Sequence, residues 1–268
     1  RGILAETISS FQLGFAPNGW EGLKKHLTEQ GYSEEDMLSA GLIVESEDKK
    51  KHDRFRGKLM FPIKDEKKRV TGFGARVLDG SLPKYINSPQ TAVFDKSGTL
   101  YGIDHAAQSI RKQDLAVIVE GYMDVIITHQ GGFANVVASM GTAITEKHVN
   151  TLKRMTGNLA LALDADSAGE EAMLRCVAFE NILDSELKII VLPDAKDPDE
   201  VVKENPEEWK RLIDKAVPVL QYTFDIVAST HPRTALEKSA AARRLLPLIG
   251  QINNVVRRGH YLQKLAVL

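Results

Sequence analysis

Four short apolar segments between residues 116 and 192 constrain the fold of this chain most strongly. The segments cover residues 116–119, 135–138, 159–163 and 187–192, and their starts lie 19 to 28 residues apart. Such spacing leaves room for a crossover helix between successive strands. Buried strands of a parallel sheet read as continuous apolar runs, because helices cover both faces. The spacing therefore predicts an α/β fold with a parallel, doubly wound sheet over residues 116–205.

Acidic side chains follow three of these predicted strands. Asp164 and Asp166 come directly after 159–163, Glu120 comes directly after 116–119, and Asp197 and Asp199 lie in the loop after 187–192. Ligands of such sheets bind beyond the carboxyl ends of the strands. Two carboxylates two residues apart repel each other unless a cation lies between them, and hard oxygen ligands suit Mg²⁺. Taken alone, an Asp-x-Asp pair is more often a turn or a helix N-cap, but three acidic loops at one sheet edge predict a metal site. The candidate metal ligands are Glu120, Asp124, Asp164, Asp166, Asp197 and Asp199.

The flanking segments have different patterns. Residues 59–63 and 70–77 predict two strands joined by a charged turn, and the segment PKYINSP at 83–89 reads as an exposed loop. Trp20, Leu23 and Leu27 are spaced as on one helical face. Residues 206–268 are helical in pattern. We therefore predict an N-terminal mixed α/β basic subdomain (1–115), a central sheet domain (116–205) and a C-terminal helical subdomain (206–268).

Charge is distributed unevenly although the net charge is only −1. Residues 54–96 contain ten Lys and Arg against four Asp and Glu, whereas residues 116–210 contain eight against seventeen. Residues 211–268 are again basic, with nine against three. An acidic centre between basic flanks is typical of a metal-dependent enzyme that acts on nucleic acid, because cations neutralise the centre while the flanks bind phosphates.

Bulk properties exclude several classes of protein. Cys176 is the single cysteine, so no intrachain disulfide and no cysteine-based zinc site can form. No apolar stretch approaches the ~20 residues of a membrane span, and no secretory signal opens the chain, so we expect a cytoplasmic protein without membrane contact. The chain starts at Arg1 rather than Met, which indicates a fragment of a longer protein.

Several motifs resemble those of one family. EGYMDV (120–125), ASMGTAIT (138–145), LALDADSAG (161–169) and LPDAKDPDEVV (192–202) resemble the Toprim motifs of bacterial replicative primases of the DnaG type. RFRGKLMFPI (54–63), GFGARVL (72–78) and PKYINSPQTAVFDK (83–96) resemble the basic subdomain that precedes the Toprim fold in those primases. The resemblance covers most of residues 1–205 in order.

The resemblance implies roles for individual residues. Glu120, Asp164 and Asp166 correspond to catalytic metal ligands, with Mg²⁺ or Mn²⁺ as the cofactor, and Asp124, Asp197 and Asp199 match further acidic positions. Nucleotide or DNA contacts are implied for Arg1, Arg54, Arg56, Arg76, Lys84, Tyr85, Asn87 and Lys96. For Tyr85, packing in the core is nearly as plausible as base stacking.

The implied activity is a DNA-directed RNA polymerase that makes short RNA primers on single-stranded DNA from ribonucleoside triphosphates by two-metal nucleotidyl transfer. The family carries a zinc-binding module and a helicase-interaction module. We expect neither in this chain, so that the replicative helicase would bind through a missing C-terminal module. Two alternatives stay open at this point: another Toprim enzyme (a topoisomerase or nuclease), and a non-catalytic Toprim module that binds nucleic acid.

Overall fold

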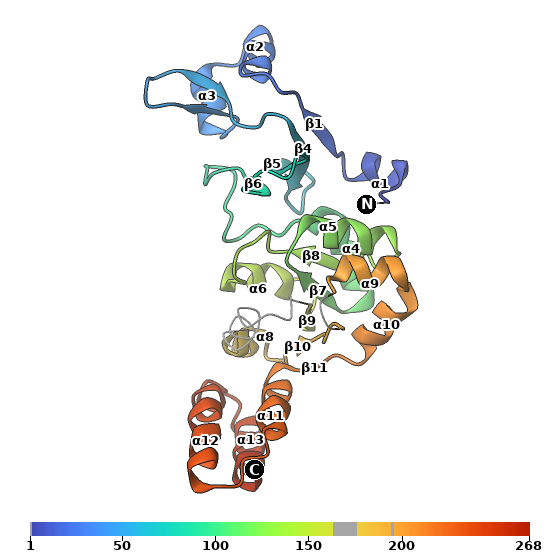
Figure 1. Cartoon of the computed structure of the whole chain (residues 1–268), viewed down its shortest axis with the longest axis vertical. Helices are drawn as coiled ribbons and strands as arrows, with labels where there is room; N and C mark the ends of the chain where they lie inside the picture. Colours follow the sequence, from blue (N-terminus) through green and yellow to red (C-terminus); the bar gives the residue numbers. More distant parts are fainter. Residues whose placement is uncertain (1, 163–175, 194–195) are drawn as a thin grey trace. The chain divides into compact units, whose positions relative to one another are not determined.

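The computed structural model describes residues 2–162, 176–193 and 196–268, which form two compact units, Arg1–Asp104 and His105–Leu268 (Figure 1). Asp164, Asp166 and Arg1 lie outside the described residues. The boundary between the units follows Asp104, whereas the predicted subdomain boundary follows residue 115; the three-part division stays a prediction. Within the part of the chain that the structure describes, no helix is long and apolar enough to cross a membrane.

The first unit is built around an antiparallel sheet with the strand order β1-β4-β5-β6. A separate pair of strands, β2 and β3, lies beside two short helices. The elements of this unit are α1 (Ala5–Ser10), β1 (Gly14–Ala16), α2 (Gly22–Glu29), α3 (Glu34–Ser39), β2 (Ile43–Glu45), β3 (Lys51–Asp53), β4 (Lys58–Lys64), β5 (Val70–Val77) and β6 (Tyr85–Asn87). Helix α4 (Ile103–Gln113) begins at its end.

The predicted hairpin is confirmed as β4 and β5, which pair in antiparallel register with a shift between Ile63 and Lys64. Gly72 of β5 lies against the Phe94 ring, because a Cβ added there would come 3.0 Å from two ring atoms. Phe61, Ile63 and Phe94 are fully buried under this sheet. The glycine in β5 therefore marks a close packing contact with the Phe94 side chain.

Two local expectations in this unit are wrong. Residues Tyr85–Asn87 of the PKYINSP segment form strand β6, which pairs with β5, and are not a loop. Helix α2 begins at Gly22, so Trp20 does not share a helical face with Leu23 and Leu27 and is 62% exposed. Pairing with β5 overrides the loop signal of the two prolines, which flank β6 rather than interrupt it.

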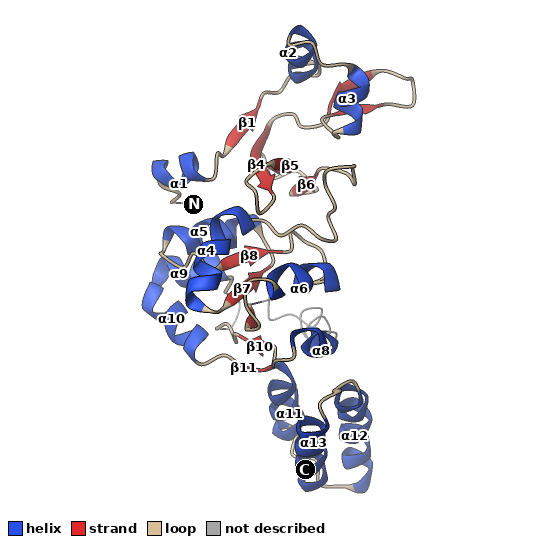
Figure 2. Cartoon of the chain, turned by 180° about the vertical axis from the view of Figure 1, so that it is seen from behind, coloured by secondary structure: helices blue, strands red, loops and turns tan. Residues whose placement is uncertain are grey.

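The second unit contains a sheet with the order β11-β10-β9-β7-β8, whose strands are labelled in Figure 1. Figure 2 shows the same sheet with its strands in red and the neighbouring helices in blue. Strands β10, β9, β7 and β8 run parallel, which confirms the predicted α/β fold with a parallel sheet, while β11 pairs antiparallel at the edge beside β10. The elements are β7 (Ala116–Val119), α5 (Tyr122–Gln130), β8 (Val136–Ala138), α6 (Glu146–Lys153), β9 (Leu159–Leu161), a 3₁₀ turn (Val177–Phe179), α8 (Glu180–Leu183), β10 (Lys188–Ile189), α9 (Pro198–Glu204), α10 (Pro206–Asp214), β11 (Val217–Pro218), α11 (Val219–Ser229), α12 (Ala235–Gly250) and α13 (Val255–Val267).

The core of this sheet consists of its central strands. Every residue of β7, β8 and β9 is buried, as continuous apolar runs require. Strands β9 and β10 are shorter than the predicted spans 159–163 and 187–192. Burial lowers the pKa of His129 to about 4, so its ring is neutral at pH 7 and Nε2 donates to the Val136 carbonyl at 2.8 Å. This hydrogen bond ties the end of α5 to β8.

The three C-terminal helices share a hydrophobic cluster, which confirms the predicted helical pattern there. Leu220 and Phe224 of α11 pack with Leu245 of α12 and Tyr261 of α13, and the Phe224 and Tyr261 rings stack at 5.5 Å. The Arg257 guanidinium lies 2.6 Å from the buried Glu180 carboxylate of α8. This ion pair fixes α13 to the helix that precedes β10.

Helices α5 and α9 pack closely at one glycine. A Cβ added to Gly131, which follows α5, would lie 2.5 Å from Cγ1 of Val202 on α9. The backbone of Gly131 is in an ordinary conformation (φ −76°), so the lack of a side chain matters here for space alone. Helix α5 follows Glu120 and helix α9 follows Asp197, so this contact fixes the spacing between those two acidic residues.

We expect Gly131→Ala to lower the free energy of unfolding by about 1–3 kcal/mol, because the added methyl group must displace Val202. Adding Val202→Ala should recover part of the loss. Urea denaturation measures both changes. Gly157→Ala is the matched control, because an added Cβ there meets only the Leu183 carbonyl at 4.0 Å. Equal stabilities of Gly131→Ala and Gly157→Ala would contradict the packing argument.

Candidate functional site

The parallel strands bring the predicted acidic segments to one edge of the sheet. Ile118 of β7 and Ile189 of β10 both pair with Leu161 of β9, so the carboxyl ends of these neighbouring strands lie side by side. Glu120 is the first residue after β7 and is half-buried. Asp164 and Asp166 follow β9 in the sequence but lie outside the described residues. The structure therefore places Glu120 at the edge where the chain leaves β9 toward both aspartates.

Asp124 caps the helix that follows Glu120. Its Oδ2 accepts a hydrogen bond from the Gly121 backbone N–H at 3.0 Å, in the first turn of α5. The Asp124 carbonyl oxygen also accepts a hydrogen bond from the Thr128 hydroxyl at 2.7 Å. A carboxylate at this position satisfies an otherwise unpaired N–H and favours the helix dipole. Asp124 thus fixes the direction in which the chain leaves Glu120.

Asp197 and Asp199 flank the start of α9 and differ in environment. Asp197 is exposed and its backbone carbonyl accepts hydrogen bonds from Glu200 and Val201. Asp199 is 1% exposed, and its Oδ2 lies 2.6 Å from the Lys203 ammonium one turn along the helix. Pro198 between them occupies the first helical position, which fits its missing N–H.

The donor chemistry at this edge fits a divalent cation of the Mg²⁺ class. The described carboxylates offer hard oxygen ligands, and that of Asp199 already holds a cationic ammonium group. Among the described residues, which exclude 163–175 and 194–195, no three His, Cys, Asp or Glu side chains are grouped closely enough to hold an ion. The described carboxylates would therefore need further ligands, and Asp164 and Asp166 are the ones that the sequence predicts.

In the first unit, the predicted nucleic-acid residues gather on β5 and β6. Arg76 pairs with Tyr85 across the strands, donates to the Tyr85 hydroxyl at 3.0 Å and lies over its ring at 5.2 Å. Tyr85 is 36% exposed, and its ring lies 6.3 Å from the buried Phe61 ring, so it both contacts the core and is open to solvent. Arg54 donates to the Asn87 carbonyl at 3.1 Å. These contacts join four of the predicted residues in two pairs, Arg76 with Tyr85 and Arg54 with Asn87, both of which include a residue of β6.

Arg54 is unusually placed for a surface arginine. Burial lowers the pKa of its guanidinium, and its Nε is buried without a hydrogen-bond partner in the part of the chain that the structure describes. An unsatisfied buried donor on a cation is energetically costly, which distinguishes Arg54 from a fully hydrated surface arginine. Lys84 is exposed directly before β6, and Lys96 is half-buried on the segment that follows Phe94. Lys84 is thus the lysine adjacent to Tyr85, and Lys96 follows Phe94, whose ring packs against Gly72 of β5.

Trp20 is a candidate that sequence analysis missed. The Arg56 guanidinium lies over the indole ring at 4.0 Å, and the His52 ring meets the indole edge-on at 5.0 Å. An exposed aromatic ring under an arginine offers both a stacking surface and a positive charge to a single-stranded nucleic acid. The available sequence signal was an aromatic residue shortly before Gly22, at the start of a helix.

Asp53 explains why Trp20 lies outside α2. The buried Asp53 carboxylate accepts hydrogen bonds from the Leu23 and Lys24 N–H groups at 2.7 and 2.9 Å, so it caps α2 from thirty residues away. Its own N–H donates to the Trp20 carbonyl at 2.8 Å, and its carbonyl accepts from Arg56. One buried aspartate therefore positions both the indole and the arginine above it.

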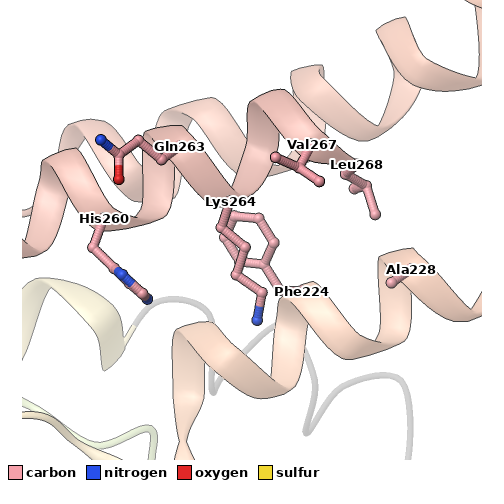
Figure 3. A pocket seen from close by; sticks show the side chains of 7 residues that line it. All are labelled: Phe224, Ala228, His260, Gln263, Lys264, Val267 and Leu268. Carbon is pink, nitrogen blue, oxygen red and sulfur yellow. The ribbon is translucent and has the colours of Figure 1, made fainter.

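Two apolar hollows among the described residues are lined by none of the predicted site residues. A groove of about 480 Å³ lies between α11 and α13, with Lys264 held over the Phe224 ring at 5.2 Å (Figure 3). A second hollow of about 610 Å³ lies in the first unit beside Asp53, with Phe15, Leu27 and Phe55 in its wall.

Comparison with known proteins identifies the parts of this chain. A family model described as the DNA primase catalytic core, N-terminal domain, matches residues 1–107, and a Toprim-like model matches residues 117–202. A third model, the DnaB-helicase binding domain of primase, matches residues 222–268. This last match disagrees with the expectation that the chain lacks a helicase-interaction module.

Individual relatives agree with these family matches. A DNA primase of Clostridium acetobutylicum is 44% identical over 226 residues, which cover 84% of this chain and 38% of the relative. The crystal structure of the RNA polymerase domain of Mycobacterium tuberculosis primase DnaG has a TM-score of 0.89 at 33% identity, covering 100% of this chain and 88% of that chain. A DnaG primase catalytic domain bound to ssDNA has a TM-score of 0.86 at 34% identity, with coverages of 100% and 88%. This chain therefore spans about two fifths of the curated relative's length but nearly all of the structural domain.

We expect Asp124→Ala to lower the free energy of unfolding by about 1 kcal/mol, because the Gly121 N–H loses its acceptor. Asp124→Asn should retain most of the stability, since its side-chain oxygen can still accept that hydrogen bond. Urea denaturation followed by circular dichroism distinguishes the two variants. If Asp124→Asn lost as much stability as Asp124→Ala, the capping role would be wrong.

Proposed function

Because this chain belongs to the DnaG family of bacterial DNA primases, we propose that it is the RNA polymerase core that makes short RNA primers on single-stranded DNA. The observation that carries the proposal is the acidic edge of the parallel sheet, with Glu120 beside the strand that leads into Asp164 and Asp166. As a bacterial replication enzyme, it would act in the cytoplasm.

Glu120, Asp164 and Asp166 are the proposed catalytic carboxylates, and they would hold Mg²⁺ or Mn²⁺ with help from Asp197 and Asp199. When bound, the cations supply positive charge that favours an ionised attacking 3′-hydroxyl and a leaving pyrophosphate. Glu120 would act as a ligand rather than a base, because a carboxylate beside cations stays ionised and accepts protons weakly. Asp124 would contribute through the direction of α5, since its carboxylate caps that helix.

Basic residues of the first unit would bind the triphosphate and the DNA template. We propose that Arg76 and Lys84, together with Arg1, contact triphosphate oxygens, and that Arg54, Asn87 and Lys96 contact nucleotide or template. Arg76 is held in place by the Tyr85 hydroxyl, so its guanidinium is partly pre-organised for a phosphate. Trp20 under Arg56 would stack on a template base.

A helicase contact is the remaining proposed partnership. The model described as a DnaB-helicase binding domain matches α11, α12 and α13, so we propose that these helices belong to the surface that a replicative helicase contacts. The RNA polymerase domain of the M. tuberculosis primase also covers these helices, which supports their place in the catalytic core.

Glu120→Gln and Asp164→Ala should each reduce incorporation of labelled ribonucleotides on single-stranded DNA by about 10²-fold or more, because each removes a ligand that would hold the cations near the reacting phosphate. Folding should be preserved, since removing one carboxylate relieves repulsion in the metal-free protein. Glu146→Gln is the matched control, an exposed carboxylate in the first turn of α6.

Other outcomes of that assay discriminate the alternatives. Wild-type activity in Asp164→Ala would refute the assignment of the metal ligands. Cleavage or relaxation of DNA without nucleotide incorporation would favour a topoisomerase or nuclease. DNA binding with neither activity would favour a non-catalytic Toprim module.

Trp20→Ala should weaken binding of single-stranded DNA by about 5- to 100-fold, the effect of losing one stacked base. Its salt dependence should stay unchanged, whereas Arg76→Ala should lower the slope of log K against log salt by about 0.7 for each phosphate that the arginine no longer neutralises. Bound DNA should also quench Trp20 fluorescence in a Trp209→Phe background, where only the exposed indole remains.

Tyr32→Ala is the control for this measurement, because Tyr32 is a 58% exposed aromatic residue of the same unit that is not among the proposed DNA contacts. Fluorescence titrations at several salt concentrations provide both the affinity and the slope. Equal affinities of Trp20→Ala and Tyr32→Ala would remove the stacking role of Trp20.

A further inference from the structure

Asp199 carries a counter-ion from its own helix. Its side chain is 2% exposed, and its Oδ2 lies 2.6 Å from the Lys203 Nζ, whereas the Lys203 side chain is 34% exposed. The same contact satisfies the geometry of a hydrogen bond from the ammonium to the carboxylate. A buried anion is thus neutralised by a cation that reaches it from the solvent side.

Removal from water makes this counter-ion necessary. A buried carboxylate is strongly unfavourable unless a cation or several hydrogen-bond donors compensate it. One compensating group here is a lysine, a compact charge on a long stem with several rotatable bonds. Such a side chain can leave the carboxylate and remain hydrated, because a third of it is already in solvent.

A divalent cation and this ammonium would compete for Asp199. Both are attracted to the same carboxylate, and their like charges repel each other at the short distances of a shared ligand. The pairing that stabilises the metal-free protein therefore opposes metal binding. Lys203 therefore has two effects, one on the stability of α9 and one on the binding of a cation at Asp199.

We propose that Lys203 is an internal counter-ion that competes with the divalent cation for Asp199 and so sets the metal affinity of the catalytic site. This inference rests on the proposed function, in which Asp199 helps to hold the cation. The rival explanation is an ordinary salt bridge within a helix, which would stabilise α9 with no effect on metal binding.

The two explanations predict different metal affinities for Lys203→Met, which keeps the length of the side chain but removes the charge. The counter-ion role predicts about tenfold tighter Mn²⁺ binding, measured from free Mn²⁺ by electron paramagnetic resonance. It also predicts a lower Tm in EDTA that saturating Mg²⁺ restores, because the cation then replaces the lost ammonium. An unchanged or weaker Mn²⁺ affinity, with a Tm deficit that Mg²⁺ does not reduce, would overturn the proposal.

Two further variants keep the test decisive. Lys203→Arg preserves the ion pair and should fold, and its forked guanidinium should hold the carboxylate more firmly and weaken Mn²⁺ binding several-fold; unchanged or tighter binding would contradict the proposal. Lys210→Met removes an exposed lysine of α10 and should leave Mn²⁺ affinity and Tm unchanged. A gain in affinity equal to that of Lys203→Met would reduce the effect to net charge and overturn the proposal.

Primer synthesis by the wild-type chain is measured separately. If the wild-type chain makes primers but Lys203→Met binds Mn²⁺ like the wild type, the counter-ion inference fails alone. If Lys203→Met binds Mn²⁺ more tightly but the wild type makes no primers, the proposed function fails and the counter-ion role stands. If no variant binds Mn²⁺, both are wrong.

Discussion

Parallel pairing of β10, β9 and β7 is the constraint on which the candidate site depends. Ile118 and Ile189 both pair with Leu161, so the segments that follow these strands leave the sheet at the same edge. The strands are fully buried apolar runs, and a slip in register would move Glu120 relative to the segment that carries Asp164. Hydrophobic packing and backbone hydrogen bonds of these strands therefore position the described part of the site.

The acidic residues near this edge have different structural duties. Asp124 caps α5, while Asp199 is buried and paired with Lys203. Close packing of Gly131 against Val202 then fixes α5 beside α9. The metal-free chain thus tolerates several acidic residues near this edge, because Asp124 already accepts a helix N–H and Asp199 is paired with a lysine. Substitutions of different acidic residues should therefore affect the free energy of unfolding and the catalytic rate to different extents.

Most of this arrangement could be predicted from the sequence, because its signals are local. Apolar runs at regular spacing predict the buried strands, and the β4–β5 hairpin follows from its two strand patterns. Strand β6, edge strand β11 and the exposed position of Trp20 could not be predicted, because each depends on a distant partner. Tyr85–Asn87 becomes a strand only beside β5, and Trp20 is excluded from α2 because Asp53 caps that helix at Leu23 and Lys24. Asp164 and Asp166 remain sequence predictions.

A crystal of this chain soaked with Mn²⁺ tests the central claim, that one sheet edge holds the cation, most directly. Anomalous scattering locates the ion without assumptions about its ligands. The account predicts a peak bounded by the Glu120 carboxylate and the aspartates that follow β9, with Asp199 on its other side. A peak elsewhere, for example among the exposed carboxylates of α10, or no peak in the presence of bound nucleotide, would contradict it.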